Sequence, residues 1–254
     1  MNEFIQLADR LADASADVIM GHFRTDFGIE NKSDASPVTI ADRDAERAMR
    51  TIIAETFPDH GIIGEEFDNL SPDAEYVWAL DPIDGTRSFV TGKPLFGTLI
   101  ALVKNRRPIL GMINMPALGE RFVGGDGVAT TMNGKPLKVR DCGDIADAWL
   151  YTTSPHYFEG ADMAAFERLR ERTHHTVYGG DCYAYGLVAM GTVDLVCEAG
   201  LDDHDFCALV PVIEGAGGIM TDWQGKPMDL GSDGRVLAAG SKAVHAAAVA
   251  TLRA

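Results

Sequence analysis

The chain has 254 residues, of which 46% are hydrophobic and 24% are charged, and its formal net charge is −16. This size suits one large domain or two closely packed lobes, and the composition is that of a globular chain with a sizeable core. The negative charge argues against a nucleic-acid partner, because affinity for a phosphate backbone comes mainly from clustered Lys and Arg. Solubility alone is an equally simple reason for this charge.

The sequence also bears on cellular location. No apolar run approaches the roughly 20 residues that a membrane-spanning helix needs. Asp9, Asp13 and Asp17 interrupt the apolar residues of the N-terminal segment, which is unlike a signal peptide. None of the cysteines forms a Cys-x-x-Cys pair, and this favours reduced, buried thiols. We therefore expect a cytoplasmic protein with no membrane partner.

Helical periodicity predicts two amphipathic helices in the N-terminal part, at residues 4–23 and 39–57, with Pro58 ending the second. Short apolar runs then predict strands at residues 61–64, 76–80, 95–103, 109–115 and 121–123. Asn133-Gly134 is a strong signal for a tight turn. We expect one largely antiparallel sheet with the two helices on its face.

The C-terminal part alternates between strands and helices. Strands are predicted at residues 149–153, 193–197, 218–222 and 236–240. Helices are predicted at residues 163–172, 182–190 and 205–216, followed by an alanine-rich helix at the end of the chain. Such alternation is typical of an α/β lobe. We expect an N-terminal α+β lobe at residues 1–140 and a C-terminal α/β lobe at residues 141–254, packed as one compact unit.

The most informative segment follows the apolar run at residues 76–80, where Asp81 and Asp84 stand three positions apart around a proline. Carboxylates at the end of a strand can project into the crevice where α/β sheets bind ligands. Gly85 permits a close approach of the backbone, and the amides at Thr86 and beyond can bind an anion. Asp-Gly-Thr is also ordinary turn chemistry, so this segment alone leaves a metal site and a capped turn open.

Two further segments offer carboxylates. Glu65 and Glu66 follow the apolar run at residues 61–64, and because neighbouring side chains point in different directions, only one of them is expected to bind a ligand directly. Asp205 stands at a predicted helix start, where it could instead favour the helix dipole. Clustered carboxylates repel one another unless a cation neutralises them, and ligand sets made only of oxygen favour Mg²⁺, Mn²⁺ or Ca²⁺. The segments together predict a divalent-metal site that receives a phosphate.

Three strings resemble the signatures of the inositol monophosphatase family and occur in the same order along nearly the whole chain. They are Gly64-Glu65-Glu66, Asp-Pro-Ile-Asp-Gly-Thr at residues 81–86, and Asp205 followed by Glu-Gly-Ala-Gly-Gly at residues 214–218. Residues 32–42 resemble the N-terminal element of that family. The resemblance implies an α/β protein with the layered αβαβα sandwich of this sugar-phosphatase type. It also implies a homodimer with two or three Mg²⁺ ions per active site, for which Mn²⁺ is a possible substitute.

Carried over position by position, the resemblance implies the metal ligands Glu65, Asp81, the carbonyl of Ile83, Asp84 and Asp205. Most of these ligands belong to the N-terminal lobe, and the C-terminal lobe completes the site. Asp42 is expected near a weaker third metal, and Glu66 is expected to support the cluster from nearby.

The same resemblance implies how the reaction proceeds. The residues implied in catalysis are Thr86, Glu65, Asp42 and Glu66, with Thr86 and Glu65 orienting the attacking water. Asp84 and the backbone amides of Gly85 and Thr86 are expected to bind the phosphate. The implied reaction is an in-line attack by a metal-activated water on a small phosphate monoester, without a phosphoenzyme.

Departures from the family pattern point to a subgroup. His204 replaces a frequent Trp before Asp205 and is expected to pack locally, and residues 181–185, 84–89, 94–100 and 209–218 resemble histidinol-phosphate phosphatases. Histidinol phosphate carries an ammonium group and an imidazole, which suit acidic side chains. Asp181, Glu198 and Asp205 are therefore expected to bind substrate, although Asp181 is equally suited to cap a helix. We predict hydrolysis of L-histidinol phosphate to L-histidinol and phosphate in histidine biosynthesis. The alternative is an inositol-1-monophosphatase or a broad phosphate monoesterase.

Overall fold

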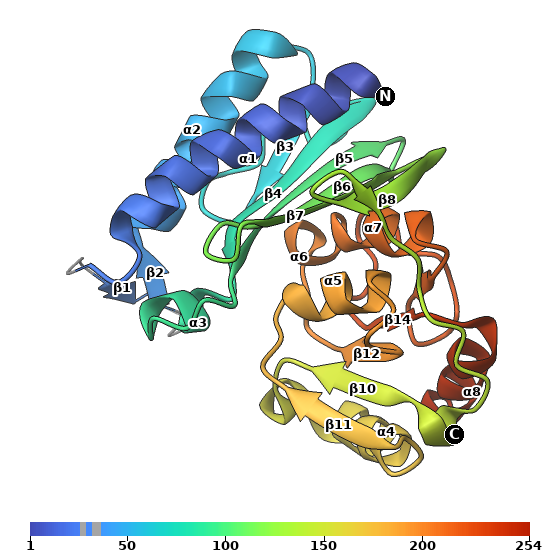
Figure 1. The fold of residues 1–254 in the computed structure, drawn as a ribbon. Helices are drawn as coiled ribbons and strands as arrows, with labels where there is room; N and C mark the ends of the chain where they lie inside the picture. The colour runs from blue at the N-terminus through green and yellow to red at the C-terminus, as the bar shows by residue number, and fades with distance from the viewer. Residues whose placement is uncertain (26–28, 32–36) are drawn as a thin grey trace.

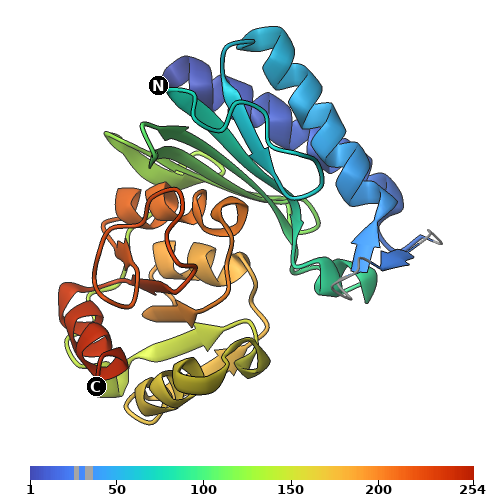
Figure 2. The same cartoon turned by 180° about the vertical axis from the view of Figure 1, so that it is seen from behind.

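Figure 1 shows the computed structural model of the chain, which describes residues 1–25, 29–31 and 37–254. Residues 32–36 of the expected N-terminal family element lie outside this described part. The elements form five layers, seen from opposite sides in Figures 1 and 2: helices, a sheet, helices, a second sheet and helices. The predicted αβαβα sandwich is therefore confirmed. None of the described helices is long and apolar enough to cross a membrane.

The outer layer of the N-terminal half consists of α1 (Asn2–His22) and α2 (Ile40–Thr56), as the periodicity predicts. Their apolar faces lie against the first sheet, and Leu7, Leu11 and Ile53 pack in one core with Trp78 and Leu102 from the strands beneath. A short antiparallel pair, β1 (Ile29–Asn31) and β2 (Pro37–Thr39), lies between the two helices in the sequence. Helix α2 begins beside this strand pair, at the end of the first sheet that also carries the candidate active site described below (Figure 1).

The first sheet has seven strands that follow one another in chain order. They are β3 (Gly61–Gly64), β4 (Tyr76–Asp84), β5 (Gly97–Lys104), β6 (Arg107–Met115), β7 (Glu120–Gly125), β8 (Val128–Met132) and β9 (Lys135–Pro136). Among these seven described strands, only β3 and β4 pair in parallel, so the expectation of a largely antiparallel sheet is confirmed. Asn133 and Gly134, with φ angles of 50° and 76°, make the predicted tight turn between β8 and β9.

Strand β4 differs from the sequence prediction, which ended it at residue 80. The strand continues to Asp84, and its register with β5 shifts between Asp81 and Asp84. Pro82 lies at this shift, where a residue without an N–H donor is tolerated because the ladder is already interrupted. Asp81 and Asp84 therefore lie on an irregular strand end, and the five-residue helix α3 (Thr86–Val90) follows directly.

The second sheet has the strand order β11-β10-β12-β14-β13. Its strands are β10 (Trp149–Thr152), β11 (His175–Tyr178), β12 (Leu195–Glu198), β13 (Ile219–Thr221) and β14 (Val236–Ala239). Helices α4 (Gly160–Arg170) and α8 (Lys242–Leu252) cover its outer face, and the short helices η1 (Ile145–Asp147) and η2 (Pro155–Tyr157) flank β10. The four strands predicted for this half are confirmed, and β11 is an additional strand that the sequence did not predict.

Helices α5 (Tyr183–Ala189), α6 (Asp203–Phe206) and α7 (Leu209–Gly215) lie between the two sheets. The single helix expected at residues 205–216 is wrong, because α6 ends before α7 begins. Pro211 explains the break, since it cannot donate to the carbonyl of Cys207 four residues earlier, and its ring would clash with that carbonyl. The break leaves Asp205 on a short separate helix beside β4.

Gly111 on β6 allows the middle helices to lie close to the first sheet. A Cβ atom at this position would overlap the backbone carbonyl oxygen of Ala208, between α6 and α7. We expect Gly111→Ala to lower the free energy of unfolding by about 1–3 kcal/mol, the usual cost of overpacking. A thermal melt would measure this, with Gly143→Ala as control because no described atom lies within 4 Å of a Cβ there. Equal melting temperatures for the two variants would contradict the prediction.

Candidate active site

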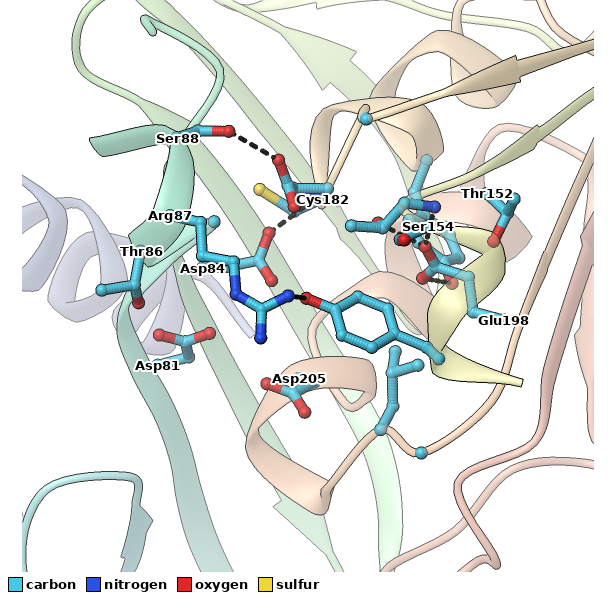
Figure 3. A pocket seen from close by; sticks show the side chains of 18 of the residues that line it. Asp81, Asp84, Thr86, Arg87, Ser88, Thr152, Ser154, Cys182, Glu198 and Asp205 are labelled. Atoms are coloured by element: carbon cyan, nitrogen blue, oxygen red, sulfur yellow. Dashed lines mark hydrogen bonds between the residues drawn. The ribbon is translucent and has the colours of Figure 1, made fainter. Parts of the chain in front are cut away.

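A pocket of about 520 Å³ lies between the two halves of the molecule. One side is formed by the end of β4 and by α3. The other side is formed by the chain after β10, the start of α5, the end of β12 and α6. Figure 3 shows that the carboxylates of Asp81, Asp84 and Asp205 point toward a shared space below Thr86 and Arg87. The pocket thus gathers acidic groups from distant parts of the sequence.

Asp81 is central to the acidic cluster. One carboxylate oxygen from each of Asp81, Asp84 and Asp205 lies within 4.8 Å of the other two, and the same holds for Asp42, Glu65 and Asp81. Asp81 is only 2% exposed, and its Oδ1 has no hydrogen-bond partner in the described part of the chain. Asp81 therefore belongs to both groups, and one of its buried oxygens is available to a ligand.

The backbone fixes the orientation of the other two pocket aspartates. Oδ2 of Asp84 accepts a hydrogen bond of 2.6 Å from the N–H of Cys182, just before α5. Oδ2 of Asp205 accepts a hydrogen bond of 2.7 Å from the N–H of Asp202 in a capping box that begins α6. Each carboxylate therefore has one oxygen held by a backbone N–H, which fixes the orientation of the side chain.

The cluster is electrostatically unfavourable without a counter-ion. Burial, and then the charges of Glu65, Asp84 and other neighbouring carboxylates, raise the pKa of Asp81 well above its usual range. Burial, followed by the charge of Asp181, likewise raises the pKa of Asp84. A cation would relieve this repulsion, and donor groups made only of carboxylate oxygen suit a hard divalent metal. The residues present therefore fit a divalent metal site.

The segment between Asp84 and α3 has the conformation that close approach to a ligand requires. Gly85 has a φ angle of 82°, in the region that favours glycine, and it precedes the first residue of α3. The hydroxyl of Thr86 donates a hydrogen bond of 3.0 Å to the carbonyl of Ile83. Because its single proton is used there, the Thr86 oxygen can only accept a hydrogen bond from a molecule in the pocket.

Asp181 and Glu198 also line this pocket. Asp181 has a φ angle of 47°, unusual for a residue with a side chain, and its Oδ2 accepts a hydrogen bond of 3.0 Å from Ser88. Burial raises the pKa of Asp181, which the Ser88 hydrogen bond partly offsets. The alternative role of Asp181 as a helix cap is wrong, because the N-cap of α5 is Cys182 and no side-chain cap bond is present there.

Glu198 is held rigidly at the end of β12. Oε1 accepts hydrogen bonds of 2.9 Å from the N–H and 2.5 Å from the hydroxyl of Thr153, and Oε2 accepts one of 2.8 Å from the hydroxyl of Tyr185. Burial raises the pKa of Glu198, and these hydrogen bonds act in the opposite direction. The remaining lone pair on Oε2 leaves room for one further donor in the pocket.

Some of the predicted site residues lie outside the pocket, and some residues that line the pocket were not predicted from the sequence. Glu66 does not line the pocket, and its backbone N–H bonds to Oε2 of Glu46 at 2.8 Å. Arg87 and Tyr157 line it and bond to each other at 2.5 Å across the two halves of the molecule. No sequence signal marked this contact, because the two residues are 70 positions apart. His204 lies beside Asp205, with Nε2 at 3.5 Å from Oδ1.

Comparison with known proteins agrees with this architecture. The model of the inositol monophosphatase family matches residues 1–254. The chain is 49% identical over 261 residues to "Bifunctional phosphatase IMPL2, chloroplastic" from Arabidopsis thaliana, covering 99% of this chain and 75% of that protein. It is 35% identical over 240 residues to a histidinol-phosphatase from Chlorobaculum parvum, covering 94% of this chain and 93% of that protein. A solved inositol monophosphatase from Zymomonas mobilis has 48% identity and a TM-score of 0.92, covering 100% of this chain and 98% of that one.

The layered fold, the acidic pocket and relatives that are named phosphatases together define a phosphoric monoester hydrolase. The chain belongs to the inositol monophosphatase family. Enzymes of this family depend on metal, and the acidic groups around Asp81 could bind it. The family resemblance drawn from the sequence is confirmed.

Proposed function

We propose that this enzyme hydrolyses L-histidinol phosphate to L-histidinol and phosphate, in histidine biosynthesis. The observation that carries the proposal is the pairing of two acidic regions in one pocket, the cluster around Asp81 and the side chains of Asp181 and Glu198. The first region suits a phosphate with its metal ions. The second suits the ammonium and imidazole of histidinol, which donate hydrogen bonds to carboxylates. The similarity to a histidinol-phosphatase from Chlorobaculum parvum supports the same substrate.

Two or three Mg²⁺ ions are the cofactors we propose, with Mn²⁺ as a substitute. Glu65, Asp81, the carbonyl of Ile83, Asp84 and Asp205 would hold them, and Asp42 would serve a weaker third position. When bound, such ions neutralise phosphate charge and lower the pKa of a bound water. Asp81 Oδ1, buried and without a hydrogen-bond partner in the described part of the chain, supports this assignment.

The residues around the phosphate would orient the reacting groups. Thr86, whose proton is donated to Ile83, would accept a hydrogen bond from the attacking water, and Glu65 would take part in the same orientation. The backbone amides of Gly85 and Thr86, with Asp84, would fix the phosphate. Glu66 would support the carboxylate cluster from its position after Glu65, without contacting the substrate directly. The water then attacks in line with the departing alcohol, and no phosphoenzyme forms.

The substrate is tested by comparing kcat/KM for histidinol phosphate and inositol 1-phosphate under saturating Mg²⁺. We expect a preference for histidinol phosphate of at least about 100-fold, because pocket carboxylates left unpaired by the wrong substrate reduce transition-state binding. A preference for inositol 1-phosphate would overturn this assignment. It would favour the second candidate, an inositol-1-monophosphatase or a broad monoesterase, which the similarity to the Zymomonas mobilis enzyme supports.

Asp181→Asn tests the residue proposed to bind the cationic end of the substrate. We expect kcat/KM for histidinol phosphate to fall by about 10- to 100-fold, the value of one charge-assisted hydrogen bond, mainly through KM. Asparagine tolerates the positive φ angle of this position, so the backbone should be retained. Hydrolysis of inositol 1-phosphate by the same variant is the control. A loss of equal size for both substrates would remove Asp181 from substrate selection.

Oligomeric state and location are further proposals. The homodimer expected from the resemblance can be tested by light scattering during size-exclusion chromatography, and a monomeric mass would contradict it. The four cysteines are free and buried, which supports the proposed cytoplasmic, reducing environment.

A further inference from the structure

Glu46 and Arg50 on α2 form an ion pair that lies outside the pocket, next to the backbone around Glu65. Glu46 is 0% exposed, and its Oε1 accepts a hydrogen bond of 2.7 Å from Nε of Arg50, one turn later on the same helix. Neither residue lines the pocket. A fully buried carboxylate is costly unless it is paired and hydrogen-bonded, so this pair has a specific structural role.

The pair binds three consecutive residues of the chain that follows β3. Glu46 Oε2 accepts a hydrogen bond of 2.8 Å from the N–H of Glu66. Arg50 donates through Nη2 to the carbonyl of Phe67 and through Nη1 to the carbonyl of Asp68, each at 3.1 Å. These contacts fix the backbone immediately after Glu65, the residue that approaches Asp81 and Asp42.

The residue before Glu65 packs directly against the same pair. A Cβ atom on Gly64 would overlap Oε1 of Glu46 and would lie 2.8 Å from Nη2 of Arg50. The Arg50 guanidinium also lies over the ring of Phe67, with its Cζ 5.7 Å from the ring centroid. The pair of Glu46 and Arg50 therefore lies against the backbone on both sides of Glu65.

The same helix carries Asp42, which lies four residues before Glu46 and so on the same helix face. Asp42, Glu65 and Asp81 bring carboxylate oxygens within 4.8 Å of one another. We infer that Glu46 and Arg50 are positioning residues that set the metal affinity of this group by fixing Glu65 relative to Asp42 and Asp81. This inference rests on the proposed role of the carboxylate cluster in metal binding.

The test compares Glu46→Gln and Arg50→Lys with the wild-type enzyme. Glutamine brings an N–H donor into a site where Glu46 now accepts from two donors, and lysine cannot serve both backbone carbonyls as the arginine fork does. The matched control is Arg170→Lys on α4, where Arg170 Nε donates to Glu167 at 2.7 Å in a second helical pair, outside the pocket. Binding is measured with Mn²⁺ as the only added metal, by quantifying the free Mn²⁺ with electron paramagnetic resonance. Melting in EDTA is recorded for each variant.

We expect both variants to weaken Mn²⁺ binding at one site by at least about tenfold, the usual effect of changing groups that support a metal ligand. The Mg²⁺ concentration for half-maximal hydrolysis should rise by a similar factor, while kcat at saturating Mg²⁺ changes by less than about threefold. Arg170→Lys should bind Mn²⁺ as the wild type does. A purely structural role would lower the melting temperature in EDTA without this change in affinity.

Wild-type Mn²⁺ affinity in Arg50→Lys would overturn the inference, whatever its melting temperature. If Glu46→Gln does not fold, Arg50→Lys decides the matter, because it keeps a positive charge beside Glu46. Asp84→Asn distinguishes this result from a failure of the proposed function. If Asp84→Asn also binds Mn²⁺ like the wild type, the carboxylate cluster is not the metal site and both proposals fail.

Discussion

Asp84→Asn should remove nearly all phosphatase activity and leave the fold intact. Asp84 contributes a carboxylate oxygen to the group with Asp81 and Asp205, and it faces the pocket where the phosphate is proposed to bind. Loss of a metal-bound phosphate contact costs several kcal/mol in the transition state, so we expect kcat/KM to fall by about 1,000-fold or more. The amide oxygen of asparagine can still accept the hydrogen bond from Cys182, so the folded structure should survive.

The measurement is the initial rate of phosphate release under saturating Mg²⁺, together with circular dichroism and a thermal melt. Asp126→Asn is the control, because the Asp126 side chain is 50% exposed, pairs with Arg107 and does not line the pocket. It should retain full activity. Wild-type activity in Asp84→Asn would show that the metal assignment is wrong.

Asp81→Asn should inactivate the enzyme and yet make the metal-free protein more stable at neutral pH. Asp81 is 2% exposed and is surrounded by carboxylates, and burial raises its pKa well above the usual range. A carboxylic acid whose pKa is higher in the folded than in the unfolded state binds its proton more tightly when folded. Its stabilising effect is full below the unfolded pKa and is lost as the pH rises through the folded pKa. Removing this charge should therefore raise the melting temperature of the metal-free protein at neutral pH.

Thermal melts between about pH 5 and pH 8, with EDTA and with Mg²⁺, would measure both effects. The wild-type protein should gain stability from Mg²⁺ and the variant should not, because the variant lacks the shared ligand. Burial lowers the pKa of His60 and His245, which makes stability rise with pH. These histidines are present in both proteins, so their effect cancels in the comparison. A metal-free Asp81→Asn protein that is less stable than wild type at neutral pH would contradict this prediction.

The sequence predicts the layers of the fold well where the periodic signal is long. The amphipathic helices α1 and α2 and the apolar strands β4, β5 and β6 bury continuous faces, and their patterns are visible without the structure. Strand β11 was missed because it is a short strand at the edge of the second sheet, and both His175 and Tyr178 are exposed. The sequence prediction missed the break between α6 and α7 because Pro211 stands in an otherwise helical pattern.

The residues of the acidic cluster could be predicted from the sequence, whereas the residues that hold them in position could not. Asp81 and Asp84 stand in a distinctive string, so the resemblance located them directly. Glu46 resembled any exposed helical glutamate in the sequence, and only the tertiary structure brings it to the N–H of Glu66, 20 positions away. The contact between Arg87 and Tyr157 depends in the same way on how the two halves pack. Local patterns reveal residues that carry chemistry, whereas positioning contacts depend on packing across the chain.

The most direct test measures phosphate release from histidinol phosphate by enzyme freed of metal with EDTA and then titrated with Mg²⁺. We expect negligible hydrolysis before the titration and a saturable return of activity as Mg²⁺ fills the carboxylate cluster. Undiminished hydrolysis in excess EDTA would contradict the view that these carboxylates act by holding divalent cations against the phosphate.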